Sequence, residues 1–429
     1  MHDQISAFDA AALLIVIAAA LGYINHRWLR LPSSVGLTVM GAVASLIVIF
    51  IDAVIPASNL AEQLSAFLGD IDFHKTLMEG MLSFLLFAGA LHVDWSEMRK
   101  GRWPILVFST IGVLLSTLIV GVAFYAVSNM MGLGLPLIWC FVFGALISPT
   151  DPVAVMAVMK RAAMPETLQA TVAGESLFND GVGVVVFSIL LSIALGAEPF
   201  TVSGALMDFL REAGGGAFLG LVGGWIAFKA MRSIDDYNIE VMISLALVMG
   251  GYSLAMALHI SGPVAMAVAG LIVGNAGVAY AMSDTTRDYL IKFWSLMDEI
   301  LNAILFLLIG LEVIAVAADG KLAVAGVLAI GIVLIARALS VGLPLALMKR
   351  WVDMGPLAFP TLVWGGLRGG ISVALALSLP DSPMRTVILG VTYAVVLFAV
   401  IIQGGSVAGL IARLQRNRLP PEPELSKID

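Results

Sequence analysis

The sequence is poor in charge and in cysteine. Of its 429 residues only 12% are charged and 60% are hydrophobic, and Cys140 is the single cysteine. Soluble domains average about 25% charged residues, so a water-soluble enzyme and a disordered chain are both disfavoured. A lone cysteine excludes an intramolecular disulfide and a cysteine-based metal cluster. The five histidines are scattered, without the spacing of metal ligands.

Positive charge is scarce as well. The chain has 23 Lys and Arg against 30 Asp and Glu, which gives a net charge of −7. Proteins that bind nucleic acid present a basic surface, so we expect no nucleic-acid partner. The composition leaves a protein whose main environment is the lipid bilayer.

Continuous apolar stretches recur along the whole chain. A membrane-spanning helix needs about 20 mostly apolar residues, whereas a membrane β-barrel would show apolar residues in alternation. The sequence therefore predicts an all-α membrane protein with thirteen transmembrane helices. The predicted ranges are 8–25, 33–54, 77–93, 104–128, 137–158, 168–196, 213–230, 239–258, 262–281, 293–317, 322–347, 357–378 and 386–412.

The first predicted helix and the loop charges set the expected orientation. Met1–Ala7 contains no Lys or Arg, so we expect a retained helix rather than a cleaved signal sequence. With thirteen helices, the loops on the C-terminal side contain 17 Lys and Arg, and the opposite loops contain 4. Positive loops stay in the cytoplasm. We therefore expect an external N-terminus, a cytoplasmic C-terminus and, from the compact length, a bacterial inner membrane.

A few charged residues lie well inside the predicted helices, where a charge costs several kcal/mol. Such residues are retained when they pair, line water or bind an ion. We therefore expect a functional group rather than a purely structural pairing. They are Asp151, Glu175, Asp180, Arg337 and Arg368.

Asp151 lies in the segment Ile147–Pro152, where two prolines flank Ser, Thr and Asp. Proline cannot continue a regular helix, so the fifth helix should unwind here and turn carbonyl and hydroxyl oxygens inward. Broken helices with oxygen ligands are typical of cation sites in transporters. The alternative is a proline kink in which Asp151 only caps a helix.

Asp180 lies near the middle of the sixth predicted helix. At about 100° per residue, Ser176 and Asp180 lie on the same face of that helix. This face can turn towards the broken fifth helix. We therefore expect Ser176 and Asp180 to share one cation with Asp151 and Thr150.

A second face of the sixth helix carries Glu175 and Asn179. Arg337 lies near mid-depth of the eleventh helix and needs an anion, because an unpaired buried arginine is very costly. We expect Glu175 to be that anion, and this face to support the site structurally.

Four glycines surround Arg368 in Gly365–Gly370. This pattern indicates a second interrupted helix, with tight helix packing as the alternative use of the glycines. Arg368 then offsets either the negative end of a half-helix dipole or a nearby carboxylate.

The two interrupted helices are the fifth and the twelfth, an odd offset of seven. If helices 1–6 and 8–13 are repeats joined by helix 7, the two copies enter the membrane from opposite sides. Paired discontinuous helices indicate a transport site at mid-membrane. The fold class we predict is therefore two inverted six-helix repeats with a linker helix, in which helices 5 and 12 cross at the ion site.

A single carboxylate site can hold either a proton or a small monovalent cation. If the empty site does not reorient, this competition alone produces exchange. We expect Asp180 to carry a proton near the working pH and to release it when Na⁺ arrives.

Several motifs together resemble the monovalent cation:proton antiporters, most closely the NhaP-type sodium/proton exchangers. The strongest are Ser148–Ala154, Glu175–Gly181 and Gly365–Gly370. Further matches are Leu85–Leu91, Ser261–Gly270 and Phe306–Glu312. The resemblance runs in order over nearly the entire chain, and the combination of motifs makes it specific.

The resemblance implies a homodimer whose mobile core moves against a scaffold as an elevator. It also implies a protein that has no cofactor and that transports Na⁺ and H⁺. The implied divisions are scaffold and dimerisation helices 1–3 (1–103), core helices 4–6 (104–196), linker helix 7 (197–234), scaffold and dimerisation helices 8–10 (235–321), core helices 11–13 (322–412) and a short cytoplasmic tail (413–429).

The resemblance also implies residue roles. Asp180 is the ion and proton carrier, with Asp151, Thr150 and Ser176 completing the site. Glu175 and Arg337 are the structural ion pair of the family.

The pair Asn179–Asp180 resembles the electroneutral branch, which exchanges one Na⁺ or Li⁺ for one H⁺. Some relatives carry an acid near position 88, where this chain has Ala88. A third carboxylate is therefore not expected in the site, and water can fill that coordination.

Three other functions are open from the sequence. K⁺/H⁺ antiport would use the same site, because motifs separate Na⁺ from K⁺ poorly. An ion channel would need no proton coupling, and the sequence has no repeated pore-loop filter. An intramembrane hydrolase is disfavoured because Ser176 lacks a glycine-flanked nucleophile elbow and a histidine in reach.

Overall fold

The computed structural model describes residues 7–55, 81–196, 201–278, 281–311, 320–351 and 354–416. Within these ranges the chain forms helices joined by turns and short irregular segments, and no β-strand is present there. This confirms the predicted all-α class. Part of the third predicted helix (77–80), the end of the tenth (312–317) and most of the tail lie outside the described residues.

The first half of the chain contains α1 (Ala7–Ile24), α2 (Ser33–Val54), α5 (Leu82–Leu91), α6 (Trp95–Lys100), α7 (Arg102–Val107), α8 (Val113–Met131), α9 (Leu137–Ile147), α10 (Val153–Arg161), α11 (Glu166–Ala194) and α12 (Val202–Phe209). The second half contains α13 (Gly215–Arg232), α14 (Tyr237–Ala257), α15 (Gly262–Ile272), α17 (Asp284–Leu311), α19 (Gly320–Met348), α20 (Ala358–Trp364), α21 (Gly370–Leu377), α22 (Pro383–Phe398) and α23 (Gly405–Arg416). Single π-helical turns extend or join some of them, namely η1 (Asn25–Leu29), η4 (Phe108–Gly112), η5 (Leu210–Gly214), η6 (Val273–Gly277) and η7 (Ala399–Gly404).

The helices are those of a multi-pass membrane protein. Among the described residues, nine helical segments are long and apolar enough to cross a membrane. Three of them are continuous through a π-helical turn, namely Arg102–Met131, Ser203–Arg232 and Pro383–Arg416. Shorter apolar helices add Leu82–Leu91, Leu137–Ile147 and Gly262–Gly277. The count of thirteen and the repeat symmetry stay predictions.

The seventh predicted helix begins earlier than the sequence indicated. It starts at Val202 rather than at 213, because Thr201 caps it by accepting a hydrogen bond from Gly204 N–H (3.1 Å). Arg211 and Glu212 of η5 lie inside this helix, although their charges predict a loop there. The helix therefore spans Val202–Arg232 through α12, η5 and α13.

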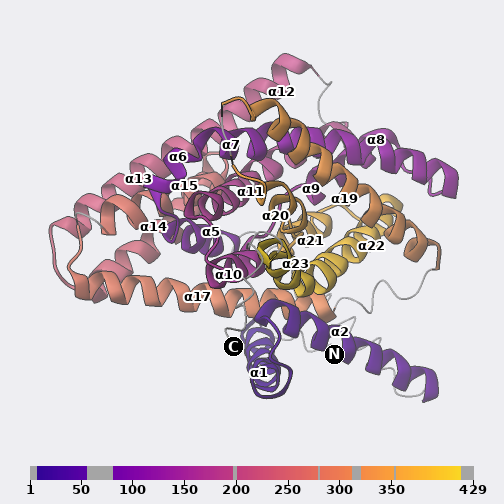
Figure 1. The fold of residues 1–429 in the computed structure, drawn as a ribbon, viewed down its shortest axis with the longest axis horizontal. Helices are drawn as coiled ribbons and strands as arrows, with labels where there is room; N and C mark the ends of the chain where they lie inside the picture. Colours follow the sequence, from indigo (N-terminus) through magenta and orange to yellow (C-terminus); the bar gives the residue numbers. More distant parts are fainter. Residues whose placement is uncertain are drawn as a thin grey trace, which may run out of the picture.

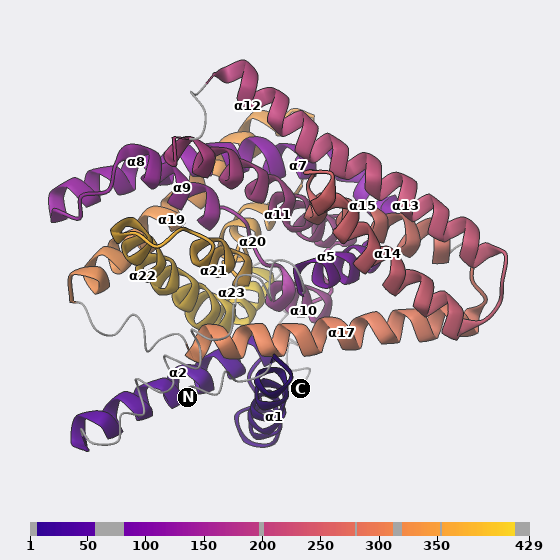
Figure 2. The same cartoon turned by 180° about the vertical axis from the view of Figure 1, so that it is seen from behind.

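Two groups of helices flank a central region. Helices α5, α13, α14 and α15 lie on one side and α8, α19 and α22 on the other, while α1, α2 and α17 lie along one end (Figures 1 and 2). Between the groups lie α10, α11, α20 and α21. Packing joins α17 to α2 through Thr38, whose hydroxyl donates to Phe306 O (3.0 Å).

Two helices are interrupted in this central region, as the sequence predicts. The first break separates α9 from α10 at residues 148–152, and the second separates α20 from α21 at residues 365–369. The two breaks meet: Asp151 N–H donates to Leu367 O (2.8 Å) in an isolated antiparallel bridge. Two unwound segments far apart in the sequence thus satisfy each other's backbone in the protein interior.

Candidate functional site

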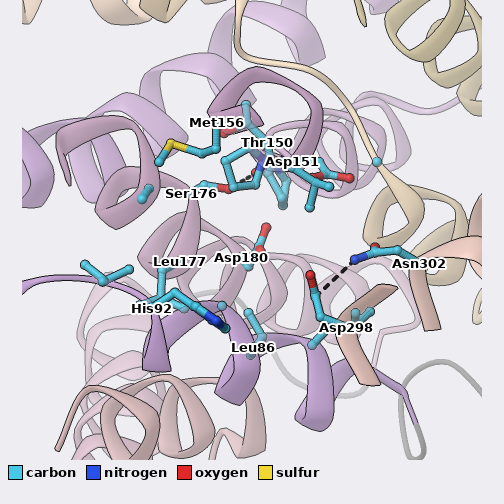
Figure 3. Close-up of a pocket in the computed structure, with 18 of the residues that line it drawn as sticks. Leu86, His92, Thr150, Asp151, Met156, Ser176, Leu177, Asp180, Asp298 and Asn302 are labelled. Atoms are coloured by element: carbon cyan, nitrogen blue, oxygen red, sulfur yellow. Dashed lines mark hydrogen bonds between the residues drawn. The ribbon is translucent and has the colours of Figure 1, made fainter. Parts of the chain in front are cut away.

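A cavity of about 610 Å³ opens beside the two crossed breaks. Helices α5, α10, α11, α17 and α21 supply its walls, so that it lies between segments from both halves of the chain. The four predicted cation ligands, Thr150, Asp151, Ser176 and Asp180, all line it. Figure 3 shows the carboxylate of Asp180 between Ser176 and Asp298.

Asp180 is only 8% exposed, on the face of α11 that it shares with Ser176. The Ser176 hydroxyl donates to Thr150 O, the carbonyl freed by the first break. Because its proton is used there, the oxygen lone pairs of Ser176 can face a cation. The first break and α11 are therefore fastened together beside the Asp180 carboxylate.

The carboxylate of Asp151 lies between the start of α10 and the cavity. This carboxylate accepts a hydrogen bond from Val153 N–H (2.9 Å), the first N–H group of α10, and the same side chain lines the cavity. The helix-capping alternative and the ion-ligand alternative are therefore compatible. The N-terminal ends of α10 and α21 both reach the cavity, and helix N-termini stabilise negative charge.

Asn179 holds the first break against α11. Its amide nitrogen donates to the Thr150 hydroxyl (2.8 Å), and its amide oxygen accepts from Thr150 N–H (3.3 Å). Asn179 itself is 1% exposed. The amide thus satisfies the N–H and the hydroxyl group of Thr150. This supports the geometry of the site without adding a charge.

Glu175 and Arg337 form a buried bidentate ion pair. The guanidinium of Arg337 donates to both carboxylate oxygens, at 2.5 and 3.0 Å. The same guanidinium donates to Leu362 O through Nε (3.1 Å) and Nη2 (2.9 Å). The pair therefore ties α11, α19 and α20 together on the side of α11 away from Asp180.

Arg368 lies on the carbonyl end of a half-helix. It is 2% exposed, and its Nη1 donates to Ser148 O and to Pro149 O, the latter at 3.0 Å. These carbonyls follow α9, so the arginine offsets the negative end of that half-helix. These contacts fit the first of the two roles that the sequence left open, and the role of Arg368 stays a prediction.

Two glycines of the second break are required by close approach. A Cβ at Gly369 would lie 2.7 Å from the Asp151 carboxylate, and a Cβ at Gly366 would lie 2.4 Å from Arg337 Nε. No larger residue fits at either position without displacing a charged group. These glycines therefore leave room for the side chains of Asp151 and Arg337 at the second break.

Among the polar lining residues that the sequence analysis did not identify are Asp298 and Asn302 on α17. Asn302 Nδ2 donates to Asp298 Oδ1 (3.0 Å), and both line the cavity across from α11. The signal was present, because Ser295, Asp298, Asn302 and Leu305 lie at helical spacing and all line the cavity. The predicted helix began at 293, whereas α17 begins at Asp284, so Asp298 lies mid-helix rather than at an end.

Ala88, where some relatives carry an acid, does not line the cavity in the described structure. It is 1% exposed, and its carbonyl contacts His92 Nδ1 (2.7 Å). His92 Nε2 lies 2.9 Å from the Ser295 hydroxyl, and the ring lines the cavity. The imidazole thus joins the C-terminal end of α5 to α17.

The mouth of the cavity is acidic. It is lined by Asp94, Glu97 and Glu166, with Lys160 as a nearby cation. The Ser96 hydroxyl and then Glu97 N–H donate to Asp94 and lower the pKa of its carboxyl, and the Lys100 ammonium lowers the pKa of Glu97. Both carboxylates are ionised at neutral pH, so the mouth attracts cations.

The side chains of the four predicted ligands carry oxygen as their only polar atoms. Across the described part of the chain, no three His, Cys, Asp or Glu side chains cluster so as to hold a metal ion. Two carboxylates with hydroxyl and carbonyl oxygens suit a proton or a small hard cation.

Comparison with known proteins agrees with this geometry. The family model described as sodium/hydrogen exchanger, transmembrane, matches residues 15–413. The Na(+)/H(+) antiporter NhaP of Pseudomonas aeruginosa is 47% identical over 412 residues, covering 95% of this chain and 96% of that protein. The Na(+)/H(+) antiporter NhaG of Bacillus atrophaeus is 34% identical over 418 residues, covering 96% of this chain and 76% of that protein.

A solved structure shares the fold. The sodium proton antiporter MjNhaP1 from Methanocaldococcus jannaschii, determined at pH 8, superposes with a TM-score of 0.71 over 92% of this chain and 97% of its own. The two sequences are 22% identical. The likeness therefore concerns the chain path.

The Glu175–Arg337 pair generates a stability prediction. Arg337→Met leaves the Glu175 carboxylate buried without its partner, so we expect a loss of about 3–5 kcal/mol. Thermal unfolding of the purified protein in detergent should show a clearly lower midpoint. The double variant Glu175→Gln/Arg337→Met removes the stranded charge and should regain part of the loss. A single variant as stable as the parent would contradict a structural role for the pair.

Proposed function

Because the chain belongs to the sodium/hydrogen exchanger family, we propose that it exchanges one Na⁺ or Li⁺ for one H⁺ by alternating occupation of Asp180. The protein is a multi-pass membrane antiporter rather than an enzyme, and its substrates are monovalent cations and protons. Beyond this general function, we propose a stoichiometry, a residue that carries the ion and a motion that moves it across the membrane.

The observation that carries this proposal is the position of Asp180. Its carboxylate is nearly enclosed, yet it lines a cavity beside oxygens of Thr150, Asp151 and Ser176. A buried carboxylate is stabilised either by a proton or by a cation, and the two compete for the same oxygens. An antiporter needs no further coupling device if the unoccupied site stays on one side.

The neighbouring residue supports the stoichiometry. The pair Asn179–Asp180 resembles the electroneutral branch of the family, whereas the electrogenic branch has two aspartates, and the Asn179 amide is hydrogen-bonded to Thr150. An amide takes up no proton in the physiological range. One cation then displaces one proton, and the exchange moves no net charge.

The walls of the cavity support an elevator motion. One wall comes from α5 and α17, within the proposed scaffold ranges 1–103 and 235–321. The other comes from α10, α11 and α21, within the proposed core ranges 104–196 and 322–412. Sliding the core past the scaffold would carry Asp180 from one side of the membrane to the other, with 197–234 as the linker. We propose a homodimer in a bacterial inner membrane, with the N-terminus outside and the C-terminus in the cytoplasm.

Asp298 has a separate role in the proposal. It belongs to the scaffold wall, and its carboxylate stands across the cavity from the core ligands. A fixed negative charge beside the path raises the local concentration of cations. We assign it to recruitment of the cation rather than to its transport.

The carrier assignment is tested in proteoliposomes. Asp180→Asn removes both the proton site and the charge that balances the cation, so cation-driven proton movement should fall to the background of protein-free vesicles. Each preparation is assayed with Na⁺, Li⁺ and K⁺, with and without an imposed membrane potential. The control Asp208→Asn alters an exposed acid on α12 and should keep parental exchange.

Three outcomes of this assay would contradict the proposal. Exchange retained by Asp180→Asn would contradict the single-site mechanism. Proton movement driven by K⁺ but not by Na⁺ would favour the K⁺/H⁺ alternative. A rate that follows the imposed potential would contradict electroneutral exchange.

The recruitment role predicts a split between kinetic parameters. Asp298→Asn should raise the apparent KM for Na⁺ several-fold at low ionic strength, with little change in maximal rate, because the carrier is intact. The matched control is Asp288→Asn, an exposed acid on the same helix that does not line the cavity. A fall in maximal rate at unchanged KM would instead make Asp298 part of the transport step.

A further inference from the structure

A second cavity, of about 710 Å³, lies on another face of α17. It is bounded by the end of α1, by η1 and the start of α2, by the end of α10 and by Glu299 and Ala303 of α17. Helices α1, α2 and α17 lie together at one end of the molecule (Figures 1 and 2). None of its lining residues is shared with the ion cavity.

Three arginines line this cavity: Arg27, Arg30 and Arg161. In the described parts of the chain, no carboxylate lies within ion-pair distance of any of them. His26 is a further basic lining residue, and Glu299 is the one acid among the lining residues. The cavity is therefore positively charged, with guanidinium groups that suit the oxygens of a phosphate.

The fold sets the position of two of these arginines. Arg30 has a left-handed backbone (φ 55°), which an ordinary side chain adopts only when its surroundings enforce it. Asn25, which is 5% exposed, enforces it by accepting from Leu31 N–H (3.2 Å) and donating to Leu31 O (2.9 Å). The turn that presents Arg27 and Arg30 is thus held from inside the protein.

The surroundings of the cavity are those of a membrane interface. Tyr23, Trp28 and Leu29 are 65%, 66% and 47% exposed, and the two aromatic rings contact each other edge to face at 6.4 Å. Exposed Trp and Tyr mark the level of the lipid headgroups. Only 17% of the span Ala11–Leu29 is buried in the protein, which leaves a long apolar surface for acyl chains.

We propose that this cavity binds the phosphate of an anionic phospholipid, with Arg27, Arg30 and Arg161 as its ligands. Basic cavities between membrane helices are known to hold such headgroups. A phosphate bound here connects the α1–α2 turn to Arg161, the last residue of α10. That half-helix begins directly after the first break, so the lipid joins the outer helices to the segment that leaves the ion site.

The test measures stability in detergent, so its result does not depend on whether the protein exchanges ions. Phosphatidylglycerol, phosphatidylethanolamine and inorganic phosphate are added separately. We expect phosphatidylglycerol to raise the unfolding midpoint and to remain bound in native mass spectrometry. Phosphatidylethanolamine and inorganic phosphate should each have a much smaller effect. A matching shift with inorganic phosphate alone would overturn the lipid assignment.

Variants locate the effect. Arg27→Gln/Arg30→Gln/Arg161→Gln should weaken phosphatidylglycerol binding at least about tenfold. The control Arg232→Gln/Arg287→Gln/Lys349→Gln removes as many exposed basic residues outside the cavity and should bind like the parent. Equal loss in both triple variants, or no loss in the first, would overturn the proposal.

A gain-of-binding variant guards against misfolding of the triple variant. Glu299→Gln removes the negative charge that lines the cavity beside the arginines. We expect phosphatidylglycerol to bind this variant more tightly than the parent and to stabilise it more. Unchanged or weaker binding would place the lipid elsewhere and contradict the assignment.

Discussion

The site depends on one constraint, the need to satisfy unwound backbone inside a membrane protein. Each unpaired backbone group in an apolar interior costs several kcal/mol, and this chain interrupts two central helices. The two breaks satisfy each other through the hydrogen bond from Asp151 to Leu367 O. Arg368 satisfies the carbonyls of Ser148 and Pro149, which follow α9. The two breaks therefore support each other as one unit, and the carboxylates of Asp151 and Asp180 lie beside it.

Helix α11, which packs against this crossing, carries two buried carboxylates on different faces, Glu175 and Asp180. On one side of α11, the charge of Glu175 is neutralised by Arg337 and cannot be exchanged. On the other side, Asp180 has a cavity in place of a partner. Glu175 and Asp180 lie five positions apart on α11. Glu175 belongs to an ion pair, whereas the Asp180 carboxylate faces the cavity. The proposed role of Asp180 as the carrier rests on this difference.

Much of this arrangement could be predicted from the sequence. Prolines on both sides of Asp151 and glycines on both sides of Arg368 indicated the breaks, because clustered residues of these types weaken a helix. The contacts of Arg368 could not be predicted, since they depend on the tertiary crossing. Asp298 was missed because helix boundaries are uncertain where charged residues enter a membrane helix, as they do in η5 and at the start of α17. Its role follows only from the cavity that α17 lines.

The most direct test of the central claim is to count the protons that leave the protein when Na⁺ binds. Purified protein in a weakly buffered solution, at a pH where the carboxylate is protonated, is titrated with Na⁺ while released acid and bound Na⁺ are measured together. Competition at one carboxylate predicts about one proton released for each Na⁺ bound. Binding of Na⁺ with no release of protons would contradict the account.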